Sequence, residues 1–164
     1  MDHGKQFLDW MQPIATLREQ CYKHPKYLWS SLESLLIKEG GLYIGNNWKG
    51  KKGTPKECFR NAFKLSSKDA NYVYTEGLAF APNLPLPLAH AWCTTLDGKV
   101  YDPTWPDGVA YLGIPVLREA VLDFIGKQGH YGILDYPNLP LQTPLEQWLD
   151  PRVERTTLQP LISA

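Results

Sequence analysis

The chain has little of what marks a secreted, membrane or nucleic-acid-binding protein. Only three of its 164 residues are cysteines, at unrelated spacings, so neither a disulfide framework nor a paired-cysteine metal site is expected. Its 17 basic and 17 acidic residues cancel, which predicts no nucleic-acid partner. No apolar run reaches the length of a membrane span, and the first five residues do not resemble a signal peptide. We therefore expect a cytoplasmic protein without a membrane partner. Its oligomeric state stays open.

The composition fits one globular domain. Hydrophobic residues make up 43% of the chain and charged residues 21%, and 164 residues suit a single core. The apolar residues of segment 1–40 recur at three- and four-residue steps, which predicts helices, with Pro13 and Pro25 separating them. Segment 54–115 is expected to be the central part of the domain, and the proline-rich tail 137–164 is expected to wrap around it.

Strand patterns follow in the middle of the chain. Segments 72–80, 88–96 and 99–105 are rich in aromatic and β-branched residues and are separated by prolines and by Asp97-Gly98. A short strand at 111–115 and a helix at 116–125, closed by Gly126, come next. A second helix start is expected at Thr143. This order predicts an α+β fold with an antiparallel sheet.

Cys58 stands at a predicted helix start. Thr54 is a suitable cap, Pro55 suits the first helical position, and Glu57 completes a capping box. Cys58 then falls in the first turn, where the free N–H groups and the helix dipole favour a thiolate. The alternative for any cysteine is a small buried apolar side chain, and we assign that role to Cys21 and Cys93.

His90 and Asp102 occupy facing strands. His90 lies between two small residues, Ala89 and Ala91, and Asp102 takes a position of the next strand where an apolar residue would be usual. A buried carboxylate is nearly always paired. A thiol, an imidazole and a carboxylate on three elements can form a nucleophilic relay. The alternative is that His90 is only a hydrogen-bonded core residue.

The turn between the two strands decides whether this relay can form. A two-residue turn at Asp97-Gly98 would pair Asp102 with Cys93 and leave His90 on the other face of the sheet. A three-residue turn with Gly98 in a left-handed conformation would pair Asp102 with Trp92, diagonal to His90 and within reach of it. The relay therefore requires the three-residue turn.

Three segments resemble the motif blocks of a known superfamily. Residues 54–62 (TPKECFRNA), 90–92 (HAW) and 102–105 (DPTW) are similar to those of transglutaminase-like enzymes, a branch of the papain-like cysteine enzymes, over about residues 40–115. The resemblance implies a papain-like α+β fold in which the nucleophile helix packs on an antiparallel sheet. It further implies Cys58 as nucleophile, His90 as general base and then acid, and Asp102 as the carboxylate that orients His90, with no metal and no cofactor.

Other residues are candidates for binding the substrate or its oxyanion. The N–H of Cys58 would be one oxyanion donor, and the second would come from the loop before it. Asn61 shares a helix face with Cys58, although a structural role is an equal alternative. Glu76 could orient a substrate or pair with a lysine. The complete set of candidates is Asn46, Asn47, Trp48, Asn61, Glu76 and Trp92.

The loop 45–53 nearly matches a phosphate-binding motif. We reject that interpretation because Lys52 replaces the hydroxyl residue that would bind magnesium and the next helix starts late. Its lysines are either a solvated charge run or a basic rim that attracts an anionic substrate.

The expected chemistry is acyl transfer on a small-molecule or peptide substrate. Hydrolysis of an amide or peptide-type bond by a Cys58-His90-Asp102 triad is the first choice, since water is the default acceptor. Alternatives are an acyltransferase or transglutaminase with an amine acceptor, and a catalytically silent domain that binds a ligand or nucleotide derivative.

Overall fold

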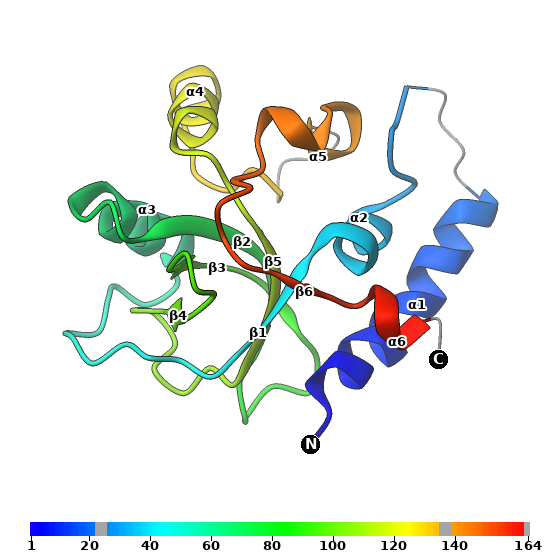
Figure 1. Ribbon diagram of the computed structural model, residues 1–164, viewed down its shortest axis with the longest axis horizontal. Coiled ribbons are helices and arrows are strands. Elements are labelled where there is room, and N and C mark those ends of the chain that lie inside the picture. The colour runs from blue at the N-terminus through cyan, green and yellow to red at the C-terminus, as the bar shows by residue number, and fades with distance from the viewer. Residues whose placement is uncertain (22–25, 135–138, 163–164) are drawn as a thin grey trace.

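An antiparallel, curled sheet is the centre of the fold (Figure 1). The computed structural model describes residues 1–21, 26–134 and 139–162. Within them the sheet has six strands in the order β4-β3-β2-β5-β1-β6, with antiparallel neighbours throughout. The strands are β1 (Gly41–Ile44), β2 (Val73–Phe80), β3 (Leu88–Thr94), β4 (Val100–Tyr101), β5 (Ala110–Pro115) and β6 (Thr156–Thr157).

Helices cover one face of this sheet. The longer ones are α1 (His3–Cys21), α2 (Leu32–Glu39), α3 (Cys58–Lys68) and α4 (Arg118–Gln128). The shorter ones are α5 (Leu139–Gln142), the 3-10 helix η1 (Leu145–Gln147) and α6 (Gln159–Ile162). In Figure 1, α3 and α1 lie at opposite ends of the sheet.

The two faces of the sheet have separate apolar clusters. On the helical face, Phe7 and Met11 of α1 and Ala62 of α3 pack with the inward side chains of the strands. On the opposite face, Trp92 and Tyr111 are completely buried in a smaller cluster. Alternation along β3 places Ala91 and Cys93 on the helical face and His90 and Trp92 on the other. The expected α+β class with an antiparallel sheet is therefore found.

The hairpin between β3 and β4 has the register that the relay requires. Cys93 pairs with Tyr101 and Thr94 with Val100, so the turn has three residues. Gly98 has a left-handed φ of 74°, which a side chain rarely tolerates. Its N–H donates to the carbonyl of Thr95. The three-residue prediction is confirmed.

Several predicted helix boundaries were wrong. Pro13 lies inside a continuous α1 rather than between two helices, and Pro25 lies outside the described residues. Helix α4 runs past Gly126 and ends at Gly129, whose left-handed φ of 74° forms the cap. At Thr143 no capping box forms, and a 3-10 turn follows instead.

The tail returns to the sheet, although residues 137–138 and 163–164 of it lie outside the described part. Leu149 forms an isolated bridge with Val116, and β6 adds the last strand beside β1. The tail thus pairs with the sheet as well as packing on it. None of the helices in the described ranges combines the length and apolar character needed to cross a bilayer.

Candidate active site

His90 and Asp102 form a buried pair on the face of the sheet opposite the helices. Nε2 of His90 lies 2.7 Å from Oδ2 of Asp102, and the two side chains are 1% and 0% exposed. Because an ionised carboxylate only accepts hydrogen bonds, Nε2 carries the proton in this contact. The other ring nitrogen, Nδ1, is then the one that can accept a proton.

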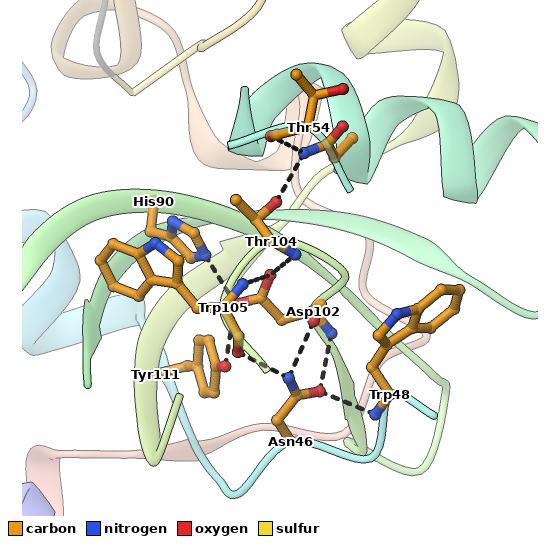
Figure 2. Close-up of polar contacts among 9 residues, drawn as sticks. Asn46, Trp48, Thr54, His90, Asp102, Thr104, Trp105 and Tyr111 are labelled. Atoms are coloured by element: carbon orange, nitrogen blue, oxygen red, sulfur yellow. Dashed lines mark hydrogen bonds and ion pairs between the residues drawn. The ribbon is translucent and has the colours of Figure 1, made fainter. Parts of the chain in front are cut away.

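The carboxylate of Asp102 is held by three further donors. Oδ1 accepts hydrogen bonds from the backbone N–H groups of Thr104 (2.8 Å) and Trp105 (3.1 Å). Oδ2 also accepts from the Tyr111 hydroxyl at 3.1 Å. Figure 2 shows Asp102 at the centre of this network. The donors fix the orientation of the carboxylate and offset the cost of burying its charge.

The indole of Trp105 covers the imidazole of His90. Their ring centroids are 3.9 Å apart and the planes differ by 18°. Figure 2 shows the two labelled side chains beside each other. Trp105 is only half-buried, so it separates the His90–Asp102 pair from solvent. In this drier environment the hydrogen bond between the pair is stronger than it would be in water.

Cys58 is the first residue of α3 and is half-buried. Of the two cysteines predicted to be buried, Cys93 is buried, but Cys21 at the end of α1 is exposed, so that prediction was wrong. The predicted capping box does not form, because Pro55 and Lys56 belong to a turn and Lys56 has a left-handed φ of 64°. Glu57 takes the cap position without a side-chain hydrogen bond. The helix therefore begins later than predicted, and the N–H of Cys58 has no partner inside it.

The short β4 leaves the part of β3 that contains His90 without a strand partner on that side. Strand β4 pairs only with Cys93 and Thr94, so beyond them β3 has no strand on that side. The chain after Asp102 and the segment before Cys58 meet here, since the N–H of Gly53 donates to the carbonyl of Pro103 at 2.7 Å. The start of α3 can thus approach His90 although α3 packs on the other face.

The pKa of His90 is raised to about 9. Burial by itself lowers this pKa, but the hydrogen bond that His90 donates to Asp102, the interaction with the Cys58 thiol and the charges of both groups outweigh it. Within the described residues, Nδ1 has no hydrogen bond of ordinary geometry. The thiol thus lies near the imidazole without an aligned hydrogen bond, a common arrangement before substrate binds. The site favours a protonated His90 beside the sulfur.

Asn46 ties the loop before Cys58 to the Asp102 segment. Its Nδ2 donates to the carbonyls of Asp102 and Trp105, both at 2.9 Å. Its Oδ1 accepts from the N–H groups of Asp102 (3.0 Å) and Trp48 (2.9 Å). Figure 2 shows Asn46 bridging these two chain segments. With all these groups engaged, Asn46 positions the loop and is not free to bind an oxyanion.

The side-chain donors of Asn47 and Trp48 are also engaged. Nδ2 of Asn47 donates to the carbonyl of Val100 at 3.2 Å. Nε1 of Trp48 donates to the carbonyl of Lys51 at 3.1 Å, within the same loop. The predicted oxyanion role of Trp48 would require its bond to break, because the indole has one N–H, whereas the amide of Asn47 has a second N–H that this bond does not use.

Asn61 links α3 to the segments on both sides of the site. Its Nδ2 donates to the carbonyl of Thr54 at 2.8 Å and to the hydroxyl of Thr104 at 3.0 Å. Asn61 is buried. The contacts support the structural role among the two alternatives, in which Asn61 fixes the helix start relative to Asp102.

Trp92 and Glu76 lie in the interior instead of facing a substrate. Trp92 is completely buried against Gly113. Glu76 lies on the helical face, where Oε1 accepts from the Tyr74 hydroxyl (2.6 Å) and from the N–H of Ile133 (2.7 Å). Oε2 accepts from the N–H of Leu134 at 2.7 Å. These contacts give Glu76 a structural anchor role.

Thr104, Trp105 and Tyr111 hold Asp102 in place but were not among the predicted site residues. Thr104 and Trp105 belong to the same motif block as Asp102, and this closeness in sequence was a signal that could have identified them. Tyr111 is on β5, which is not a neighbour of β4, and no local pattern points from it to Asp102.

No protein-family model, curated protein or solved structure matches the chain. The resemblance in the three motif blocks thus remains an expectation, and a functional assignment rests on the site itself.

Proposed function

We propose that the protein is a cysteine-dependent acyl-transfer enzyme of papain-like, transglutaminase-like architecture that hydrolyses an amide or peptide-type bond. The observation that carries this proposal is the buried His90–Asp102 pair, with Nε2 2.7 Å from Oδ2. It leaves Nδ1 available beside a thiol at the start of a helix. The three side chains have complementary roles, which a merely structural histidine would not need.

The first half of the reaction forms an acyl-enzyme. The thiol proton of Cys58 first moves to Nδ1 of His90, which gives a thiolate beside an imidazolium. Sγ then attacks the carbonyl carbon and a C–S bond forms. The N–H of Cys58 can donate to the oxyanion of the tetrahedral intermediate. When that intermediate collapses, the C–N bond breaks and the protonated His90 gives its proton to the leaving amine.

The second half releases the acyl group. Nδ1 of His90 takes a proton from water as the oxygen attacks the thioester carbonyl. The C–S bond then breaks, the proton returns to sulfur, and a carboxylic acid leaves. Asp102 accepts the Nε2 hydrogen bond throughout and stabilises the imidazolium each time it forms.

Intact-mass spectrometry with 4-nitrophenyl acetate tests this proposal. Mixing should give a burst of 4-nitrophenol and one acetyl group on Cys58. Cys58→Ser should lose the burst and the adduct while keeping the unfolding midpoint, because a half-buried thiol contributes little to packing. Cys21→Ser is the matched control and should behave as the unchanged protein.

Each outcome of this experiment decides between alternatives. If the folded protein gains no acetyl group on Cys58, the enzyme proposal is contradicted. A domain that only binds a ligand would then be favoured. An adduct that is released faster when glycinamide is added, with acetylglycinamide as product, would indicate an amine acceptor. Release at a rate independent of the amine supports hydrolysis.

A further inference from the structure

The segment that leads into Cys58 has a local excess of positive charge, although the whole chain is neutral. Its only acidic residue, Glu57, is paired with Arg60 at 3.2 Å, so those two charges cancel. Four exposed lysines are left, and none of them forms an ion pair with a described residue. We call them the basic rim: Lys49, Lys51, Lys52 and Lys56.

The backbone of the basic rim is held in a defined conformation. The indole N–H of Trp48 donates to the carbonyl of Lys51, and Gly50 packs against the same indole so closely that a Cβ would overlap it. Gly53 bonds to the chain that follows Asp102, and the carbonyl of Thr54 accepts from Asn61 in the first turn of α3. The loop that carries the lysines is therefore attached both to the segment after Asp102 and to the first turn of α3.

The acidic groups near this loop do not balance its charge. Asp102 is buried and paired with His90, and Asp97 in the hairpin turn is paired with Lys99 at 2.7 Å. Glu154 is exposed and its N–H donates to the carbonyl of Leu96 in the same turn, so its charge can offset one of the four lysines. Asp107 is exposed, but its loop contacts the far end of the 45–53 segment, where the N–H of Gly45 donates to Val109. A net positive potential thus remains at the approach to Cys58, and the positive end of α3 adds to it.

We propose that the basic rim recognises a carboxylate or phosphate on the substrate, close to the carbonyl that Cys58 attacks. This inference rests on the proposed function and adds the charge of the substrate to it. Exposed ammonium groups attract an anion over about 10 Å at moderate salt and raise its local concentration. Such attraction increases the rate of productive encounter without requiring one fixed contact.

Alkylation of Cys58 by iodoacetate and by iodoacetamide measures this potential directly. The reagents deliver nearly the same group, but only iodoacetate is anionic. The ratio of their rate constants, read by peptide mass spectrometry in the full-length protein, should be higher at Cys58 than at the exposed Cys21. In the triple variant Lys49→Gln, Lys51→Gln, Lys52→Gln we expect the Cys58 ratio to fall about five- to tenfold at low salt, roughly twofold for each charge about 10 Å away.

A control variant separates local from overall charge. Lys5→Gln, Lys38→Gln, Lys127→Gln removes the same charge at exposed positions on α1, α2 and α4 and should leave the Cys58 ratio within about twofold of the unchanged protein. High salt should reduce the difference between the two triple variants.

The results distinguish this inference from the proposed function. If iodoacetamide labels Cys58 rapidly but the ratio does not respond to the rim substitutions, the basic rim is a solvated charge run and the catalytic proposal stands. Equal falls in both triple variants would likewise overturn the inference. If neither reagent labels Cys58, both proposals fail.

Discussion

Nε2 of His90 and Oδ2 of Asp102 lie 2.7 Å apart in a region that solvent does not reach. Since the carboxylate also binds two backbone N–H groups through Oδ1, it cannot rotate to offer His90 a different atom without losing them. The hydrogen bond to Nε2 therefore selects, for the neutral ring, the tautomer in which Nδ1 can accept a proton.

Asp102→Asn should reverse that tautomer. The two backbone donors will keep the amide oxygen at the Oδ1 position, which places the NH₂ group against Nε2. Nε2 must then accept, and the ring proton moves to Nδ1, where it cannot take the proton of Cys58. We expect turnover, or acetylation by 4-nitrophenyl acetate, to fall about ten- to a thousandfold.

Tyr111→Phe is the matched control for this substitution. It removes the other hydrogen bond to Oδ2 but leaves the tautomer unchanged, so its effect on the rate should be much smaller. Asp102→Asn could instead destabilise the protein while its folded fraction alkylates Cys58 as fast as the unchanged protein. That result would show that Asp102 is a structural partner only.

His90 should make stability depend on pH between about 6.5 and 9. Its folded-state pKa of about 9 lies above its ordinary value of 6.5, so the folded protein holds the proton more tightly. The resulting stabilisation is complete below pH 6.5 and is lost as the pH rises through 9. It amounts to about 3 kcal/mol.

Urea unfolding at pH 6, 7.5 and 9.5 checks this dependence. The free energy of unfolding should fall more steeply with pH in the unchanged protein than in His90→Gln, because the variant lacks the titrating group. Parallel curves for the two proteins would contradict the assignment.

Asn61→Ala should loosen α3 from the Asp102 segment. It removes the bonds to Thr54 and Thr104 and leaves their oxygens without that donor, which we expect to cost about 1–3 kcal/mol of unfolding free energy. Cys58 alkylation at neutral pH should slow in the folded variant. Asn71→Ala, at an exposed position after α3, should change stability by less than about 0.5 kcal/mol.

Glu76→Gln should destabilise the fold without acting on the chemistry. The amide can keep an oxygen toward Tyr74 and Ile133, but its NH₂ group then faces the N–H of Leu134, donor against donor. We expect a loss of about 2–4 kcal/mol in urea unfolding. The exposed Glu146→Gln serves as control. If Glu76→Gln has normal stability but its Cys58 is alkylated slowly, Glu76 would instead contribute to the active site.

The hairpin at the site was predictable because its geometry is local. One glycine with a left-handed conformation and the alternation of side chains fix the register, and the register places Asp102 near His90. The start of α3 was less predictable. Residues 54–57 have a good capping pattern, but Asn61 and Gly53 draw this segment toward the Asp102 side, so tertiary contacts override the local preference.

The binding candidates show the limit of pattern reasoning. An amide such as that of Asn46 or Asn61 looks equally suited to a ligand or to the protein's own backbone. Asn46 is 56 residues from Asp102, its main partner, and no periodicity links two positions so far apart. The three residues of the proposed triad were recognisable because each stands in an unusual local setting, whereas the residues that hold them in place are ordinary polar residues.

The pairing of β6 with β1 has a consequence for synthesis of the chain. Strands β1 to β5, Cys58, His90, Asp102 and its donor Tyr111 all precede residue 116, whereas the strand that covers the outer edge of β1 comes only at Thr156. On the ribosome, the nascent chain can therefore bring Cys58, His90 and Asp102 together while the outer edge of β1 is still unpaired. An unpaired edge can recruit a strand from a neighbouring chain. Until residues 156–157 pair with β1, we therefore expect aggregation to compete with completion of the sheet.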